Sequence, residues 1–350
     1  MDFRKYNIGF QLLKTHLLHQ NIPISASIVI TNKCNLNCLY CFQKEIRNQR
    51  DFTLRELSNL VEELIGMGTR YFSINGGEAL LRDDLDVIIE KIKKKNILCH
   101  LTTNGLLIKD NIPLIKKFDS IAISLQGNRE SHDSLRGAGT YDKVVKAIEL
   151  LTKEEIKFHI TTVLTKNNVG HIKDILNLAC LYKCQSQFHR YRGDKNFGLD
   201  DEELIKAIQE IIDYKKRGLP VDFPIKVYEN FLNWGKRISY RKKQLYDKEI
   251  VASNHLVPCR MRRFHCHIEG DGLIYPCWEL VGKFKALNFL EVGLKRAWEN
   301  STKTKCRACY NIGCNAHSLI FALNPSSIWD MFIPSRRIMR LRKIGPLLQT

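Results

Sequence analysis

The chain has 350 residues, 44% of them hydrophobic, and a formal net charge of +18 from 55 basic and 37 acidic residues. The apolar content excludes a wholly disordered chain, and the length predicts a main domain with a smaller second one. The positive charge favours anionic partners without identifying them. The sequence shows no recognisable RNA-binding motif and no run of the ~18–20 apolar residues that a membrane-spanning helix requires.

The first predicted strand, over residues 27–31, leads directly into three closely spaced cysteines. Cys34, Cys38 and Cys41 form the pattern Cys-x3-Cys-x2-Cys. A cubane iron–sulfur cluster held by protein alone takes four cysteines, so three leave one iron with an open position. A zinc loop and buried structural thiols are the alternatives, because zinc also favours thiolates.

Further strands are predicted along the chain, and polar or glycine-containing motifs follow them. The second strand ends in Gly76-Gly77-Glu78, where glycines allow a close backbone approach and Glu78 offers an acceptor. The third strand ends in Thr103-Asn104-Gly105, and the fourth leads into Gln126-Gly127. These strands cover residues 71–75, 97–102 and 120–125, with amphipathic helices over 53–65 and 83–95.

The alternation of strand and helix continues through residues 141–152, 156–163, 169–182 and 184–188. Repeated units of this kind imply parallel strands with helical crossovers, which close toward a barrel. Functional groups then gather at the carboxyl ends of the strands. All of the motifs above are predicted to lie at that edge.

The cysteine pattern followed by Gly-Gly-Glu resembles the signature of the radical SAM superfamily. The resemblance implies an α/β fold with a partial (β/α)6 TIM-like barrel, and a [4Fe–4S] cluster on Cys34, Cys38 and Cys41 that binds S-adenosylmethionine (SAM). In that family the cofactor supplies a 5′-deoxyadenosyl radical, while the protein supplies position and shielding. The SAM-binding residues implied by the resemblance are Tyr40, Gly76, Gly77, Glu78, Thr103, Asn104, Ser124 and Arg136.

Two further family patterns surround the fourth strand. The pattern His-Asp-x-x-Arg-Gly is intact from His132 to Gly137, whereas Gln126 replaces the usual Asp of Ser-Leu-Asp-Gly. An anionic contact at Gln126 is therefore not implied. A structural alternative stays open, in which Ser124 caps the next helix and Arg136 is a solvated loop residue.

The remaining thiols of interest lie in the C-terminal third. Residues 268–277 predict a hairpin whose Asp-Gly turn presents Cys277 on the return strand. Together with Cys259, Cys306 and Cys309, this cysteine makes a set of four thiolates that can close around one cluster. A four-cysteine zinc ribbon is the main rival, and disulfides are a third interpretation. Absence of a signal peptide and oxygen-sensitive ligands favour a reducing cytoplasm.

This set resembles the SPASM/twitch extension of radical SAM enzymes, a small iron–sulfur domain of a β-hairpin plus helix. The resemblance assigns Cys259, Cys277, Cys306 and Cys309 to one auxiliary [4Fe–4S] cluster. Ser318 replaces the last cysteine of the full SPASM pattern, which favours one auxiliary cluster over two. Cys266 and Cys314 are the substitutes if an assigned ligand is wrong, and Cys99, Cys180 and Cys184 are predicted to pack as small hydrophobes.

The predicted organisation has five parts. They are an N-terminal helical extension (1–21), the radical SAM core (22–215), a helical connection (216–249), the auxiliary-cluster domain (250–320) and a basic amphipathic tail (321–350). The tail joins the apolar run 328–333 to five positive charges within 335–345. It is predicted either to lie on an anionic membrane or to dock on the barrel as a terminal helix.

The sequence thus predicts a cytoplasmic radical SAM enzyme that abstracts hydrogen from an unidentified substrate. A two-electron oxidation or a peptide or natural-product modification would use the auxiliary cluster, with flavodoxin or ferredoxin as reductant and an anionic or peptide substrate. His189, after the sixth strand, has either a substrate-contacting or a structural role. The alternatives are a non-catalytic iron–sulfur electron-transfer or scaffold protein and a zinc-binding interaction protein.

Overall fold

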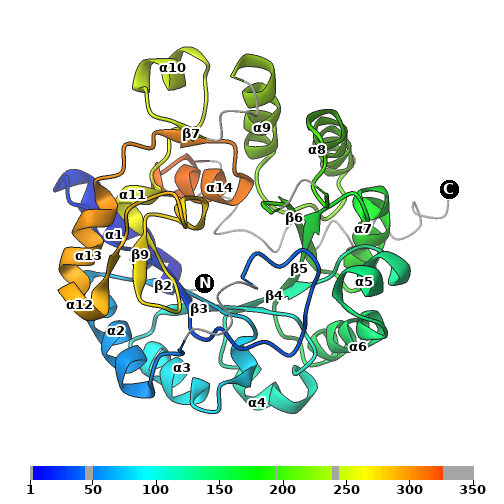
Figure 1. Ribbon diagram of the computed structural model, residues 1–350, viewed down its shortest axis with the longest axis horizontal. Coiled ribbons are helices and arrows are strands. Elements are labelled where there is room, and N and C mark those ends of the chain that lie inside the picture. The colour runs from blue at the N-terminus through cyan, green and yellow to red at the C-terminus, as the bar shows by residue number, and fades with distance from the viewer. Residues whose placement is uncertain (1–2, 44–49, 194–195, 239–243, 326–350) are drawn as a thin grey trace.

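The fold is carried by one open, nine-stranded sheet with the strand order β10-β9-β8-β1-β2-β3-β4-β5-β6 (Figure 1). The computed structural model describes residues 3–43, 50–193, 196–238 and 244–325. Strands β1 to β6 are parallel and adjacent in chain order, which confirms the predicted partial barrel. They are β1 Ser25–Val29, β2 Tyr71–Asn75, β3 Leu98–Thr103, β4 Ser120–Ser124, β5 Phe158–Leu164 and β6 Gln185–Arg190.

Helices connect these strands on the outside of the barrel (Figure 1). The helix α2 begins with a capping box, in which the Thr53 hydroxyl accepts from the backbone of Glu56 while the Glu56 carboxylate accepts from that of Thr53. It ends at Gly68, which has a left-handed backbone with φ of 109°. The connecting helices are α2 Leu54–Met67, α3 Leu85–Lys94, α4 Ile112–Ile115, α5 Arg129–Arg136, α6 Thr140–Lys153 and α7 Ile172–Leu181.

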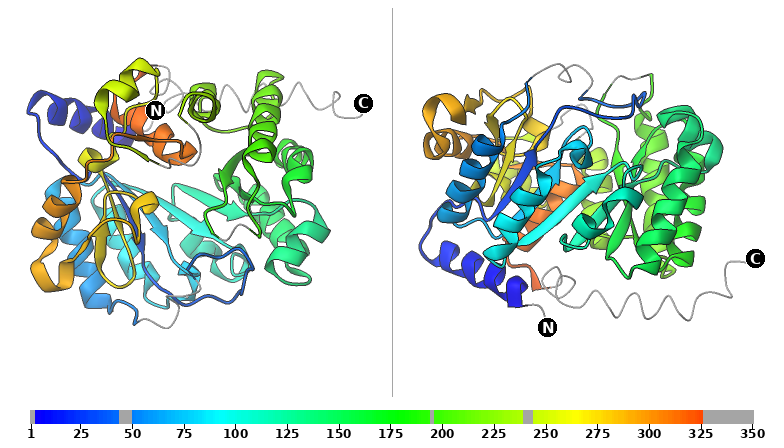
Figure 2. Two further views of the ribbon diagram at one scale, coloured as in Figure 1. Left: turned by 45° about the horizontal axis from the view of Figure 1, so that its top comes forward. Right: turned by 90° about the horizontal axis from the view of Figure 1, so that it is seen from below.

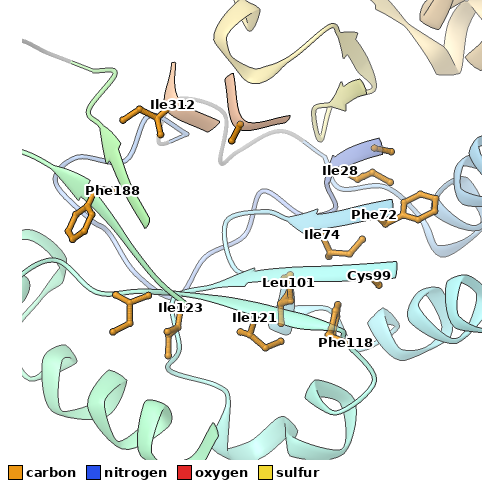
Figure 3. Close-up of a cluster of buried hydrophobic side chains, with 14 of the residues drawn as sticks. Ile28, Phe72, Ile74, Cys99, Leu101, Phe118, Ile121, Ile123, Phe188 and Ile312 are labelled. Carbon is orange, nitrogen blue, oxygen red and sulfur yellow. The ribbon is translucent and has the colours of Figure 1, made fainter. Parts of the chain in front are cut away.

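The main hydrophobic core lies between these helices and the sheet. Successive strand residues point to opposite faces, so one alternate set of each strand enters this core. Figure 3 shows the set for the central strands, in which each side chain is fully buried and leans away from the barrel interior. It includes Ile28, Phe72, Ile74, Cys99, Leu101, Ile121, Ile123 and Phe188.

The other alternate set faces the barrel interior and is polar. Ser27, Ser73, His100 and Ser120 are register partners across β1, β2, β3 and β4. The His100 ring lies 2.8 Å from the Ser120 hydroxyl and stacks on His159 of β5 at 5.4 Å between centroids. Burial and the neighbouring His159 lower the pKa of His100 to about 3. The barrel therefore encloses neutral hydrogen-bonding groups, not an aliphatic core.

The predicted hairpin is present as β8 His265–Ile268 and β9 Leu273–Tyr275. It differs from the expectation in one respect, because β8 pairs in parallel with β1 and so continues the barrel sheet. The sequence pattern gave no sign of this pairing, since a single buried strand does not identify its neighbour. The hairpin of the C-terminal part thus extends the barrel sheet beyond β1.

Other segments cover the remaining edges. α1 Phe3–Leu17 packs through Ile8 and Leu12 against α11 and α14 at the periphery, as both views of Figure 2 show. Among the described residues, no helix has the length and apolar character needed to cross a bilayer. The remaining elements are α8 Asp201–Lys216, α9 Ile225–Arg237, β7 Gln244–Leu245, α10 Lys248–Ser253, α11 Met261–Phe264, β10 Leu287–Asn288, α12 Phe289–Val292, α13 Leu294–Thr302, β11 Ala308–Cys309 and α14 Ile312–Phe321.

Candidate functional site

The three-cysteine loop leaves the carboxyl end of β1 and is fixed by its own backbone. The N–H of Leu39 donates to the carbonyl of Leu135 at the end of α5, over 2.9 Å. The N–H of Cys41 donates to the carbonyl of Cys38 over 3.2 Å, which folds the second half of the loop into a turn. Cys38 is buried, whereas Cys34 and Cys41 are half-buried. The loop therefore holds its three thiols at one strand end.

Asp51 fixes the start of this loop, a role that no sequence motif indicated. One carboxylate oxygen accepts from the Thr31 hydroxyl at 2.6 Å, and the other accepts from the Asn32 N–H at 2.8 Å. The charge-assisted bonds hold the chain as it leaves β1. The side-chain amide of the buried Asn32 has no hydrogen-bond partner among the described residues.

The Gly-Gly-Glu segment is bonded directly to the cysteine loop. The N–H of Gly77 donates to the carbonyl of Thr31, and the N–H of Glu78 donates to that of Lys33, each over 2.8 Å. A β-carbon on Gly77 would lie 2.2 Å from the Lys33 carbonyl oxygen, so a side chain has no room there. A β-carbon on Gly76 would lie 2.8 Å from the Thr31 oxygen. The glycines are thus required by the approach of two backbones.

The Glu78 carboxylate is buried and joins the ends of β2 and β3. It accepts from the Thr103 hydroxyl at 2.8 Å and from the Asn104 N–H at 2.7 Å. Burial raises the pKa of Glu78, although these donors oppose the shift. The Asn104 side chain in turn donates to the Asn35 side-chain oxygen in the cysteine loop at 2.7 Å. Three predicted site residues therefore form one hydrogen-bonded unit with the loop.

Arg136 connects the end of β4 to the three-cysteine loop. Its guanidinium donates to the Ser124 carbonyl at 2.9 Å and contacts the Cys38 thiol. Burial lowers the pKa of Arg136, but the neighbouring Tyr40, Cys38 and Glu78 outweigh it and the net shift is upward. Burial also raises the pKa of Tyr40 to about 12. The buried Nε of Arg136 has no partner among the described residues, so a donor is left for a ligand.

The side chains of Gln126 and His132 form hydrogen bonds with other groups of the protein. The Gln126 side-chain oxygen accepts from the Val163 N–H at 2.9 Å and so links β4 to β5. The Nδ1 of His132 accepts from the Gln126 N–H at 3.1 Å, and burial followed by the charge of Arg136 lowers the pKa of His132 to about 3. Asp133 accepts from the N–H groups of Gly139 and Tyr141 at the start of α6.

Five thiols gather in the C-terminal part. The four predicted ligands, Cys259, Cys277, Cys306 and Cys309, belong to one side-chain cluster, which also contains Cys314. The thiols of Cys259 and Cys306 contact each other. The Cys314 thiol contacts both Cys277 and Cys309, and these two raise the pKa of Cys314.

Ser318 lies beside this group, and its hydroxyl accepts from the Arg260 N–H at 3.1 Å and contacts the Cys259 thiol. Within the described residues, no three His, Cys, Asp or Glu side chains are arranged to hold a single metal ion.

A buried ion-pair cluster that the sequence did not reveal connects the two cysteine groups. The Glu279 carboxylate, two residues after Cys277, lies 3.1 Å from Arg190 and 3.6 Å from Arg192. It also accepts from the Asn311 amide at 2.7 Å. Burial raises the pKa of Glu279, but the two arginines outweigh it and lower the pKa overall. Because Glu279 lies more than eighty positions from Arg190 and Arg192 in the sequence, no local pattern could have indicated these ion pairs.

Arg192 also reaches the three-cysteine loop, since its guanidinium lies 5.4 Å from the Phe42 ring centre. Arg190 lies 4.7 Å from the Tyr310 ring centre, next to Cys309. The end of β6 therefore touches both cysteine groups. His189 on β6 is half-buried and its ring lies edge-on to that of Phe223. Desolvation lowers the pKa of His189 to about 4.

The other cysteines lie elsewhere. Cys99, Cys184 and Cys266 are buried in the main core, and burial raises the pKa of each of these thiols. Cys266 is the register partner of Ala26 on β1 and points away from the five thiols, as its place in that core shows.

Comparison with known proteins identifies the motif-bearing part of the chain. Residues 28–179 match the family model described as the Radical SAM superfamily. A GTP 3′,8-cyclase of Clostridium perfringens (strain 13 / Type A) is 32% identical over 198 residues, covering 52% of this chain and 61% of the cyclase. The mycofactocin maturase MftC of Mycolicibacterium smegmatis (strain ATCC 700084 / mc(2)155) is 26% identical over 290 residues, covering 80% and 71% of the two chains.

Among solved structures, SuiB of Streptococcus suis bound to S-adenosylmethionine has a TM-score of 0.62 at 20% identity, over 82% of this chain and 68% of SuiB. SuiB bound to its precursor peptide SuiA has a TM-score of 0.61 at 18% identity, over 84% and 70%. These two likenesses show the fold. The family match covers the cysteine loop, the Gly-Gly-Glu segment and Arg136. Residues 28–179 are therefore a radical SAM domain.

Proposed function

We propose that this protein is a radical SAM enzyme that cleaves S-adenosylmethionine and abstracts a hydrogen atom from its substrate. The observation that carries the proposal is the direct bonding of the Gly-Gly-Glu segment to the three-cysteine loop at the strand ends. The guanidinium of the buried Arg136 contacts the Cys38 thiol, and its Nε has no hydrogen-bond partner among the described residues. Three closely spaced loop thiols suit a [4Fe–4S] cluster with one open iron.

In this proposal Cys34, Cys38 and Cys41 hold that cluster. When bound, the cluster and SAM supply the 5′-deoxyadenosyl radical. The residues proposed to bind SAM are Tyr40, Gly76, Gly77, Glu78, Thr103, Asn104, Ser124 and Arg136. Two of these residues have different roles in the proposal. Glu78 fixes the ends of β2 and β3. Arg136 donates from its Nε, which has no partner among the described residues, to an anionic group of the ligand.

Cys259, Cys277, Cys306 and Cys309 are proposed to hold one auxiliary [4Fe–4S] cluster. The thiol-rich and largely buried cluster of side chains supports this assignment, since these ligands suit iron–sulfur chemistry. Glu279 with Arg190 and Arg192 fixes the distance between the auxiliary site and the barrel mouth. The auxiliary cluster would accept or relay the electron of a two-electron oxidation.

A peptide is the proposed substrate class. SuiB, which shares the fold, has been captured with a precursor peptide, and MftC is named a maturase. The polar face of the barrel interior supports this choice, since Ser27, Ser73 and His100 offer hydrogen bonds that a peptide backbone uses. Flavodoxin or ferredoxin is the proposed reductant. The predicted basic tail, residues 321–350, lies outside the described residues from position 326 onward.

The test is production of 5′-deoxyadenosine by anaerobically reconstituted, dithionite-reduced protein supplied with SAM. A Cys34/Cys38/Cys41→Ala variant and a Cys180→Ser control, whose thiol lies far away on α7, complete the set. Product from the wild type and the control alone supports the proposal. Iron–sulfur protein that makes no product would favour an electron-transfer or scaffold role. Zinc in place of iron and sulfide would favour an interaction protein.

A further inference from the structure

Helix α1 carries an apolar stripe on its outer side that nothing in the proposed catalytic function uses. Its inner side is buried through Ile8, Leu12 and Thr15. The outer positions follow a helical spacing of four, three and four residues, and all are large and apolar. We call these four residues the α1 stripe: Tyr6 (39% exposed), Phe10 (69%), Leu13 (48%) and Leu17 (70%). Leu18 (54%) extends it at the C-terminal end.

Exposed large hydrophobic side chains are more frequent in α1 than in the rest of the described protein. Fourteen large hydrophobic residues are exposed in the described part of the protein, and five of them fall within residues 6–18. Single exposed apolar residues are normal, but a contiguous group marks an interaction surface. Helix α1 lies at the edge of the molecule in both views of Figure 2.

The stripe has basic residues beside it, although Arg4 of α1 is paired with Asp119. No acidic residue occurs from residue 3 to residue 44 of the sequence. Just beyond α1, Arg263 donates to the Gln20 carbonyl at 3.1 Å and to the Asn21 side chain at 3.2 Å. Burial and the neighbouring Arg260 lower the pKa of Arg263, and Arg262 and Arg307 belong to the same group of arginines. An apolar stripe with positive charge beside it complements an anionic lipid surface.

The end of the described chain lies beside α1. The His16 Nε2 lies 2.7 Å from the Phe321 carbonyl oxygen at the end of α14, and the tilted His16 and Phe264 rings have centres 5.2 Å apart. Residues 326–350 follow within a few positions, and they carry the apolar run 328–333 and the basic residues of 335–345. Two segments with the composition of interfacial anchors are therefore joined to the same side of the protein.

We propose that α1 is a peripheral membrane anchor that lays the α1 stripe into the interfacial region of an anionic bilayer, with the arginines around residue 263 over the lipid headgroups. An exposed apolar face on a helix at the edge of the molecule, with positive charge beside it, suits an anionic lipid surface. The anchor requires no radical chemistry. It predicts that the enzyme works at a membrane surface, where the concentration of a membrane-associated substrate is high.

The experiment is vesicle flotation of the full chain. One vesicle type contains phosphatidylcholine alone, and the other contains phosphatidylcholine with phosphatidylglycerol. The test variant is Phe10→Gln with Leu17→Gln, at two exposed positions where glutamine keeps helix propensity. The matched control is Val87→Gln with Leu181→Gln, which removes two apolar side chains that are 50% and 67% exposed on α3 and α7.

We expect the wild type and the control to float with the anionic vesicles, less so at high salt, and the α1 variant to bind about tenfold more weakly or worse. All three proteins should make the same amount of 5′-deoxyadenosine, which separates loss of binding from misfolding and from failure of the proposed function. Equal binding to neutral vesicles would overturn the anionic specificity. Absence of binding by the wild type would overturn the proposal.

A chain ending at residue 325 completes the design. If this truncated protein still binds the anionic vesicles, α1 suffices as the anchor. If truncation abolishes binding while the α1 variant retains it, the tail is the contact and the proposal for α1 is wrong. If only the truncated protein binds, residues 326–350 cover the α1 stripe in the full chain, which also contradicts the proposal.

Discussion

The N–H of Asn104 donates a hydrogen bond of 2.7 Å to the Glu78 carboxylate, so one buried acid joins the ends of β2 and β3. The same carboxylate accepts from the Thr103 hydroxyl and, at 3.3 Å, from the Leu80 N–H. Both oxygens therefore face donors. Glu78 organises the strand ends whether or not a ligand is bound.

Replacing Glu78 by Gln should destabilise the protein before any effect on SAM is considered. The amide nitrogen must face a donor, either the Asn104 N–H or the Thr103 hydroxyl, and one buried hydrogen bond is lost. We expect a loss of about 1–3 kcal/mol in the free energy of unfolding, measured by urea denaturation. Glu291→Gln, at an exposed position, should change it by less than about 0.5 kcal/mol. Equal stability of the two variants would show that the carboxylate is not required.

Gly77→Ala should disrupt the three-cysteine loop. Its β-carbon would lie 2.2 Å from the Lys33 carbonyl oxygen, so the backbone before Cys34 must move. We expect the iron content after anaerobic reconstitution to fall from about eight to about four atoms per chain, since only the auxiliary site keeps its geometry. Gly170→Ala is the control, because a β-carbon there meets nothing within 4 Å. Full iron content in Gly77→Ala would mean that the loop tolerates the shift.

The barrel was predictable because each strand and helix has a local signal. Period-two burial in β2 and the amphipathic pattern of α2 both follow from neighbours within a few residues. The pairing of β8 with β1 joins residues about 240 positions apart, and no local pattern carries that information.

The candidate site also contains residues that the sequence predicted and residues that it did not. The cysteine loop, Gly76, Gly77 and Glu78 were found from short motifs, and the structure brings them together, although their roles toward the cluster and SAM stay predictions. Asp51 and Glu279 were missed because an isolated acidic residue resembles any surface carboxylate in sequence. Their function depends on what the fold places opposite them.

The auxiliary site makes a separate prediction about Cys314. Its thiol touches Cys277 and Cys309, yet the four proposed ligands would already complete one cluster without it. We expect Cys277→Ala to reduce iron from about eight to about four atoms per chain, and Cys314→Ala to leave about eight. Iron and acid-labile sulfide analysis checks both variants. Loss of iron in Cys314→Ala would make Cys314 a ligand in place of one assigned cysteine.

His132 should make folding stability depend on pH. Burial and then the charge of Arg136 lower its pKa to about 3 in the folded protein, whereas an unfolded chain has an ordinary histidine pKa of about 6.5. The unfolded state therefore binds a proton first as pH falls, and the stability present above about pH 6.5 declines below it. His132→Asn retains an acceptor for the Gln126 N–H but cannot titrate in this range.

Between about pH 7.5 and 5.5, the wild type should lose about 1.4 kcal/mol more unfolding free energy than His132→Asn, because 2.3RT is lost per pH unit below the unfolded pKa. His100 and His189 also have lowered pKa values, about 3 and about 4, but they titrate alike in both proteins and cancel in the difference. Urea denaturation at several pH values measures this difference directly. Parallel curves for the two proteins would mean that His132 is as easily protonated in the folded state as in the unfolded chain, and hence that the imidazole is not enclosed beside Arg136.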